Sequence, residues 1–261
     1  MNVIERGMIE QLIELREKYG VFEIKAEFEA EGSTMEEMMR LKDVTTAAGL
    51  PILLKLGGVE AVTDIYCALQ IGVKGIVAPM AETAFALSKY IDMVKKIVPP
   101  DNAQDIQFAF NLETITGCNN FKEMLALPDI TTLFGVTIGR VDLTGSMGLD
   151  RKSVDTPQIF DMARTACILA KEKGLHTAVG GAISADSIDF IKRLNSERLL
   201  DKFETRKVVF HTESVQYGEI ALNKAIHFEL NWLKAKQRFH SRVKAEDAKR
   251  IEMLEKRLSV Q

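Results

Sequence analysis

Short apolar segments alternate with amphipathic helical segments along most of the chain, and this alternation constrains the fold more than any other feature. The apolar segments are rich in β-branched residues and are followed by Gly, Asn, Asp, Ser or Thr, a pattern typical of repeated strand-helix units. Seven segments qualify as strands: Val21–Phe28, Pro51–Leu56, Gly75–Met80, Ile106–Glu113, Leu133–Ile138, His176–Gly180 and Lys207–His211. Several of the helical segments between them end in Gly, as helices often do.

This pattern favours an α/β protein with a TIM-like (β/α)8 barrel, since parallel strands joined by helical crossovers close into a barrel when there are eight. The length of 261 residues suits one such barrel. Only seven strands are evident, and residues 1–4 offer the only strand material before Val21, so we expect the first strand to be short or missing. An open doubly wound sheet is the competing fold, but no strand leads into a Gly-x-Gly-x-x-Gly turn.

The C-terminal region has a different pattern, a long and highly charged helical segment with few apolar positions. These positions are Trp232, Leu233, Phe239, Val243, Ile251, Leu254 and Leu258. Their spacing is not a sustained heptad, and the apolar stripe is too thin to form a core of its own. We therefore predict a barrel domain over 1–228 and a helical extension over 229–261 that packs on a neighbouring subunit of a homo-oligomer. A solvated tail is the alternative.

Charge and composition favour small-molecule substrates. The chain has 34 basic and 37 acidic residues, which gives no reason to expect nucleic acid or a membrane surface as partner. It has no apolar stretch long enough to span a bilayer, and its first ten residues do not resemble a targeting signal. Three widely spaced cysteines indicate reduced thiols. We expect a cytoplasmic protein.

Two acids follow neighbouring predicted strands, at the end of the barrel where such enzymes carry their reactive groups. Glu113 ends one strand and Asp142 comes just after the next. Carboxylate oxygens suit Mg²⁺ or Mn²⁺, and a metal held there would stabilise an enolate oxygen formed from a small keto acid. On spacing alone, the two acids could equally be caps of a helix and a turn.

Other charged residues near predicted strand ends are candidates for catalysis. Lys55 is flanked by leucines, and Glu27 and Glu29 alternate so as to point the same way. His211 ends the segment KVVFH, where we expect the catalytic rim, although a structural histidine is the alternative. Gly180 and the following glycine would form the seventh strand end if the first strand is missing. Barrels often bind phosphate there, so the substrate could be phosphorylated, but a tight turn would explain the glycines as well.

Three stretches, IGVKGIVAPMAET, FNLETITG and IGRVDLTGSMG, resemble in this order the signature of the HpcH/HpaI aldolase and citrate lyase family. The resemblance runs over about residues 21–181. It implies a metal-dependent barrel that handles pyruvate-like substrates, with Glu113 and Asp142 as the metal ligands. It also implies that backbone amides of the loop beginning at Gly139 receive the substrate carboxylate. The substrate-binding residues that follow from it are Pro79, Asn111, Gly139, Arg140 and Val141.

The chain departs from the family's aldolases at several positions. Lys55 stands where they carry Arg, and Asn111 where they carry Gln. Their Asp-x-Glu-His motif, which contains the general acid/base, reads Glu27-Phe28-Glu29-Ala30 in this chain. The resemblance therefore implies a carbon–carbon lyase or aldolase that works through a pyruvate-type enolate, with Lys55 and Asn111 assisting the keto oxygen. It leaves the proton-transfer residue open.

Two other functions fit the same residues. Lys55 could be the nucleophile of a Schiff-base aldolase, because a lysine among apolar neighbours at a strand end suits that chemistry. The missing histidine and the long C-terminal helix would also suit a non-catalytic barrel that binds a metabolite.

Overall fold

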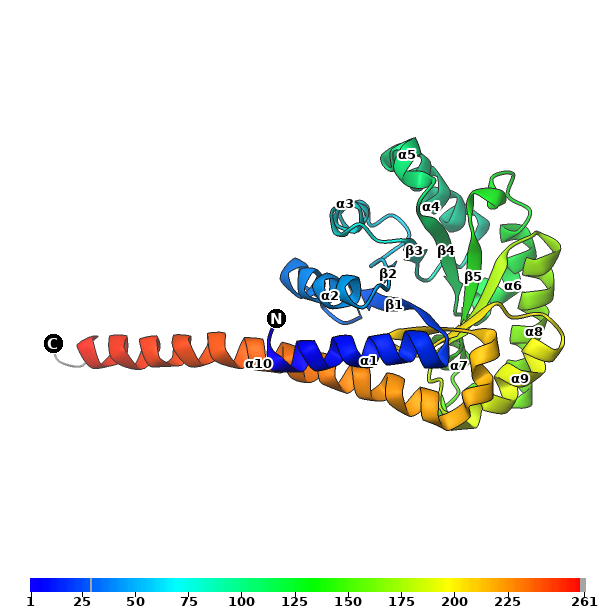
Figure 1. The fold of residues 1–261 in the computed structure, drawn as a ribbon. Helices are drawn as coiled ribbons and strands as arrows, with labels where there is room; N and C mark the ends of the chain where they lie inside the picture. Colours follow the sequence, from blue (N-terminus) through cyan, green and yellow to red (C-terminus); the bar gives the residue numbers. More distant parts are fainter. Residues whose placement is uncertain (29, 259–261) are drawn as a thin grey trace.

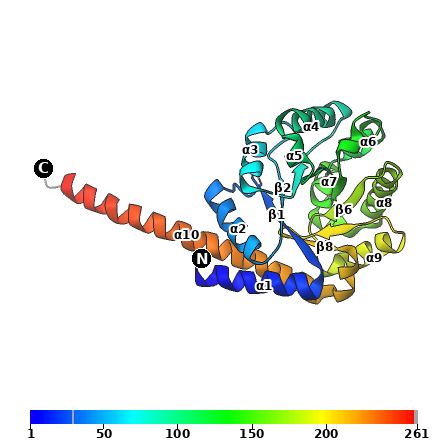
Figure 2. The ribbon, with the colours of Figure 1, turned by 45° about the horizontal axis from the view of Figure 1, so that its top comes forward.

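The computed structural model describes residues 1–28 and 30–258, and over these residues eight strands form one closed barrel in chain order. Helices surround the barrel (Figures 1 and 2). The strands are β1 (Val21–Glu27), β2 (Ile52–Lys55), β3 (Gly75–Ala78), β4 (Gln107–Leu112), β5 (Gly135–Gly139), β6 (His176–Gly180), β7 (Lys202–Glu204) and β8 (Val208–His211). The predicted TIM-like barrel is confirmed.

The helices lie mainly between consecutive strands, as the sequence pattern predicts. They are α1 (Val3–Tyr19), α2 (Met35–Ala47), α3 (Val62–Ile71), α4 (Ala84–Ile97), α5 (Pro100–Ala103), α6 (Ile115–Met124), α7 (Arg140–Ser146), α8 (Pro157–Glu172), α9 (Ile188–Ser196) and α10 (Gly218–Leu258). Short 3₁₀ helices cover Ile130–Thr132, Arg151–Asp155, Ala185–Ser187 and Thr212–Tyr217. No described helix combines the length and the apolar composition that crossing a membrane requires.

The seven predicted strands are all present, with ends within two residues of those expected, but the eighth strand is not at the N-terminus. β1 has seven residues and is preceded by helix α1, so the expectation of a short or missing first strand is wrong. The strand that the pattern missed is β7, which has only three residues. A hairpin joins β7 to β8, and β8 runs antiparallel to both β7 and β1, whereas the other neighbouring strands are parallel.

Ion pairs cross the inside of the barrel from β1 to β7. Glu23 Oε2 lies 3.0 Å from Lys202 Nζ, and Lys25 Nζ lies 2.5 Å from Glu204 Oε1. Because successive side chains of a strand point to opposite faces, the charged residues of β1 face inward, while Ile24 packs in the core between strands and helices. A small apolar cluster of Leu53, Val77 and Val209 also lies within the barrel.

Helix α10 has 41 residues, and its first half lies beside α1 (Figures 1 and 2). Phe228, Trp232 and Ala235 are buried in the core of their own chain. Further along, His240 Nε2 lies 2.8 Å from Glu37 Oε1, and beyond this contact the helix projects away from the barrel (Figure 1). The predicted domain boundary between residues 228 and 229 therefore falls within one continuous helix.

Candidate active site

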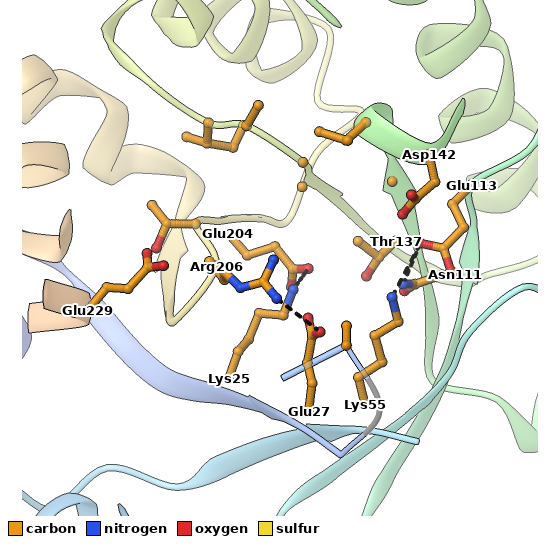
Figure 3. Close-up of a pocket in the computed structure, with 18 of the residues that line it drawn as sticks. Lys25, Glu27, Lys55, Asn111, Glu113, Thr137, Asp142, Glu204, Arg206 and Glu229 are labelled. Carbon is orange, nitrogen blue, oxygen red and sulfur yellow. Dashed lines mark hydrogen bonds and ion pairs between the residues drawn. The ribbon is translucent and has the colours of Figure 1, made fainter. Parts of the chain in front are cut away.

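A pocket of about 340 Å³ opens at the end of the barrel where β1 and its parallel neighbours terminate (Figure 3). The hairpin between β7 and β8 and one side of α10 complete its wall. Nine charged side chains line it among the described residues: Lys25, Glu27, Lys55, Glu113, Asp142, Arg151, Glu204, Arg206 and Glu229. A polar pocket of this size suits a small, charged substrate.

Glu113 follows β4 directly, and its buried carboxylate has three polar neighbours. Oε1 accepts a hydrogen bond from the Met80 backbone N–H at 3.0 Å, and Oε2 accepts one from Asn111 Nδ2 at 3.0 Å. Lys55 Nζ lies 3.6 Å from Oε2. Burial raises the pKa of the Glu113 carboxyl, and the nearby charge of Asp142 acts in the same direction, whereas Lys55 and the hydrogen bonds lower it. The predicted residues Lys55, Asn111, Glu113 and Asp142 thus do lie in one pocket.

Asp142 belongs to the first turn of α7, which begins directly after β5, and it faces the same part of the pocket as Glu113 (Figure 3). The close approach of the two elements depends on Gly139. A Cβ on this residue would lie 2.7 Å from Glu113 Cβ and 2.8 Å from Glu113 Oε2, closer than real Cβ contacts. The sequence therefore places the two carboxylates next to each other through a glycine at the end of β5.

The donor set of this site fits a hard divalent cation that keeps open positions. Over residues 1–28 and 30–258, no group of three or more His, Cys, Asp or Glu side chains could enclose a metal ion. A pair of carboxylates is what Mg²⁺ commonly takes from a protein, because it retains water and binds substrate oxygens in the remaining positions. Glu113 and Asp142 are such a pair.

Arg140 is one of the predicted substrate-binding residues, through its backbone amide, and its side chain is buried within the fold. Its guanidinium forms an ion pair with Asp155 and donates hydrogen bonds to Gly180 O at 3.2 Å, Gly181 O at 2.8 Å and Ser187 Oγ at 3.1 Å. The residue is fully inaccessible to solvent. Only its backbone remains available for the role that the sequence suggested.

The backbone at the start of α7 borders the pocket, since Gly139 and Val141 line it. The turn after β6 packs directly against this backbone. Gly181 has a φ of +84°, and a Cβ there would lie 2.7 Å from the Val141 nitrogen. Because β6 is the sixth strand, the argument for a phosphate site at the seventh strand end is wrong; Gly180 and Gly181 accept hydrogen bonds from a buried arginine instead.

Several other predicted site residues lie elsewhere. β8 is antiparallel, so His211 lies at the opposite end of the barrel, where it pairs with Lys202 at the start of β7 and stacks on Phe22. The prediction that His211 stands at the catalytic rim is wrong. Pro79 is not among the described residues that line the pocket. Glu27 does line it, with Oε2 at 3.9 Å from Arg206 Nη2, and Glu29 lies outside the described residues.

The sequence analysis missed the charged residues on the other side of the pocket. Lys25 and Glu204 pair at 2.5 Å, and both line the pocket. Burial acts to lower the pKa of Lys25, but the adjacent Glu204 carboxylate outweighs it, and the pKa is raised. The signal for Lys25 was present, because Glu23, Lys25 and Glu27 alternate along a strand and must share a face. No local sequence pattern indicates that Glu204 lies in the pocket.

Comparison with protein families gives a match to the family described as HpcH/HpaI aldolase/citrate lyase, over residues 37–186. Among curated proteins, none matches the chain.

Solved structures with the same fold cover most of the chain. An HpcH/HpaI aldolase from Desulfitobacterium hafniense DCB-2 is 15% identical, with a TM-score of 0.61 and 90% of each chain covered. An HpcH/HpaI aldolase/citrate lyase family protein from Burkholderia cenocepacia J2315 is 13% identical, with a TM-score of 0.61 and coverage of 92% of this chain and 90% of the other. A citrate lyase from Burkholderia xenovorans LB400 is 11% identical, with a TM-score of 0.58 and coverage of 80% and 71%. At these identities the likeness establishes the fold.

Proposed function

Because the chain belongs to the HpcH/HpaI aldolase/citrate lyase family, we propose that it is a metal-dependent carbon–carbon lyase or aldolase acting through the enolate of a small keto acid. Membership indicates lyase or aldolase activity on small molecules, and the family generally depends on a divalent metal. The observation that carries the finer proposal is the adjacent pair of carboxylates, Glu113 and Asp142, with Lys55 and Asn111 beside it.

Each residue of this group has a role in the proposal. Glu113 and Asp142 hold Mg²⁺ or Mn²⁺, which as a Lewis acid would stabilise negative charge on the keto oxygen. Lys55 Nζ and Asn111 Nδ2, which both contact Glu113, are the side-chain donors that assist the keto oxygen in this proposal. The backbone amides that follow Gly139 at the start of α7 receive the substrate carboxylate, since an uncapped helix start presents free N–H groups.

Removal of the metal tests this proposal. Loss of CO₂ from oxaloacetate leaves the enolate of pyruvate, so we expect the chain to decarboxylate oxaloacetate. The rate, followed by loss of oxaloacetate absorbance, should fall to background with EDTA and return with Mg²⁺ or Mn²⁺. The Asp142→Asn variant at the same metal concentration corrects for decarboxylation by the free ion. Turnover that is unchanged by chelation would contradict the proposal.

Substitutions of Lys55 separate the metal mechanism from a Schiff base. Arginine keeps the positive charge but cannot form an imine, so Lys55→Arg should retain measurable activity if Lys55 only stabilises the enolate oxygen. Lys55→Met should lose about 100-fold, as expected when one donor to a developing oxyanion is removed. Complete loss in Lys55→Arg, together with trapping of pyruvate on Lys55 by borohydride in the wild type, would favour the Schiff-base alternative.

We also propose that the projecting part of α10 packs on a second copy of the chain. Phe239, Ile251, Met253 and Leu254 are exposed on this part of the helix, beyond or at the edge of the contacts with the barrel. Removal of residues 241–261 should then lower the molecular mass measured by light scattering to that of a smaller assembly. An unchanged assembly state would favour a solvated tail.

A further inference from the structure

Glu204 is a buried carboxylate in the pocket wall, and only one of its two oxygens has a hydrogen-bond partner among the described residues. Its side chain is 3% exposed, and Oε1 accepts a hydrogen bond from Lys25 Nζ at 2.5 Å. Oε2 is buried and has no hydrogen-bond partner among the described residues. An unsatisfied buried carboxylate oxygen is costly, so its retention in a pocket wall indicates a partner that arrives with the ligand.

The charge of the Lys25–Glu204 pair defines the kind of partner. One ammonium and one carboxylate cancel, so the pair as a whole attracts neither a second cation nor an anion strongly. The free oxygen needs a neutral hydrogen-bond donor, and a hydroxyl group is the simplest one. Rotation about the last torsion of the Glu204 side chain is soft, so either oxygen can turn toward a bound molecule.

The other acidic groups that line the pocket either have another role or partner, or lie outside the barrel strands. None of the described lining residues is a histidine. Glu113 and Asp142 form the proposed metal pair, and Glu27 faces Arg206. Glu229 lies on α10, half-buried and outside the barrel strands. Among the described residues, Glu204 differs from all of these because it carries a buried oxygen without a hydrogen-bond partner.

We propose that Glu204 is the general acid/base of the lyase reaction, and that its carboxylate binds the γ-hydroxyl of a γ-hydroxy-α-keto acid. This inference rests on the proposed function. The γ-hydroxyl gives its proton to Glu204, and the O–H electron pair forms the carbonyl of the departing aldehyde or ketone. The bond between the β and γ carbons breaks, and its electrons form the enolate of the keto acid. The protonated Glu204 then returns its proton to the β carbon, which yields pyruvate and restores the carboxylate.

Lys25 acts in this scheme as a positioning residue. Its ammonium holds Oε1 of Glu204, and both groups are largely buried, with side-chain exposures of 12% and 3%. The glycine at the end of β6 leaves room for this arrangement, because a Cβ on Gly180 would lie 2.9 Å from Glu204 Oε1. Lys25 and Gly180 thus hold the Glu204 carboxylate in the wall of the pocket.

The barrel contains a matched control for a test of this role. Glu23 and Lys202 form a second ion pair between the same two strands, with side-chain exposures of 5% and 14% and an N–O distance of 3.0 Å. Neither residue is among those described as lining the pocket. Glu23→Gln therefore breaks a buried ion pair of the same kind at a place that substrate does not reach.

Two reactions separate the proton transfer from the enolate chemistry. Oxaloacetate decarboxylation needs the enolate site but has no hydroxyl to deprotonate. Cleavage of the aldol adducts of pyruvate with acetaldehyde and with pyruvate itself needs both the enolate site and deprotonation of the hydroxyl. The pyruvate released by cleavage can be followed with lactate dehydrogenase. In Glu204→Gln we expect cleavage to fall by about 100-fold or more, with decarboxylation close to the wild type. Glu23→Gln should leave the ratio of the two activities unchanged.

Glu204→Gln leaves the buried ammonium of Lys25 without its ion-pair partner, and this loss can unfold the single variant. The double variant Lys25→Met/Glu204→Gln removes the buried charge and still lacks the base, so it should show the same selective loss. Formate, added as a replacement carboxylate, should restore cleavage in Glu204→Ala and leave its decarboxylation rate unchanged. Circular dichroism and thermal melts check the fold of every variant.

The outcomes against the proposal are distinct from those against the proposed function. Equal loss of both activities in Glu204→Gln, or a matching change of the ratio in Glu23→Gln, would overturn the role of Glu204. A wild type that decarboxylates oxaloacetate but cleaves neither adduct would overturn that role and leave the enolate site standing. A wild type that is inactive in both reactions would overturn the proposed function and the role of Glu204 with it.

Discussion

The Glu113→Gln variant is expected to lose about 1,000-fold of its oxaloacetate decarboxylation activity while it keeps its fold. Lewis-acid stabilisation of the enolate oxygen is worth several kcal/mol, and each 1.36 kcal/mol corresponds to roughly tenfold in rate. Glutamine has the shape of glutamate but not its charge. Its amide group would also face Asn111 Nδ2 or Lys55 Nζ, which are donors as well. Both effects weaken a metal site that depends on two carboxylates.

The fold of this variant should survive because the charge of Glu113 is itself a cost to the folded chain. Burial raises the pKa of the Glu113 carboxyl above its value in the unfolded chain. A raised pKa of this kind stabilises the fold at low pH, and the benefit is lost as the pH rises through the folded-state pKa. At neutral pH, and without metal, the neutral glutamine removes this cost. The melting temperature of the metal-free variant should equal or exceed that of the metal-free wild type.

Binding of Mn²⁺ measured by calorimetry supplies the second readout for Glu113→Gln. We expect the affinity to fall together with the activity. Glu60→Gln is the control, since Glu60 is an exposed acid that pairs with Lys89 on the surface, with an N–O distance of 3.1 Å. Wild-type Mn²⁺ affinity in Glu113→Gln, with activity lost, would mean that Glu113 has another role.

Most of the barrel was predictable because seven of its strands are either largely apolar or alternate apolar with charged residues, and their helices are amphipathic. β7 was missed because two of its three residues are charged, which is not typical of a buried strand. Lys202 and Glu204 are tolerated inside the barrel only because Glu23 and Lys25 lie opposite them. Partners 179 residues apart leave no local pattern. The missed strand also reversed the expected direction of β8, and this is why His211 was placed at the wrong end of the barrel.

The candidate site was predictable to a similar degree. Asn111, Glu113 and Asp142 lie within the stretches that resemble the family, and Lys55 ends another parallel strand. The parallel strands bring all four residues together in one pocket. What the motif could not show is the direction of a side chain. Arg140 lies in the most specific of these stretches, yet its side chain points away from the pocket, because the first turn of a helix presents consecutive residues in different directions.

Replacement of Arg140 by Met is expected to lower the free energy of unfolding by about 3 kcal/mol, as is typical when one partner of a buried ion pair is removed. The change would leave the Asp155 carboxylate and the carbonyls of Gly180 and Gly181 without their donor, and it would remove the stacking of the guanidinium on Phe190 at 4.7 Å. For a chain of this size the melting temperature should fall by roughly 10 °C.

The outcome for Arg140→Met distinguishes a structural arginine from a substrate ligand. Arg164→Met is the control, because Arg164 pairs with Glu197 on the surface at 2.7 Å and such pairs contribute at most about 1 kcal/mol. Urea unfolding gives the stability of both variants, and steady-state kinetics on oxaloacetate at a temperature where both are folded gives KM. A fully stable Arg140→Met protein with a strongly raised KM would show that the Arg140 side chain binds the substrate. We expect the reverse, a destabilised protein whose folded fraction binds its substrate normally, because every polar contact of the guanidinium is with the protein itself.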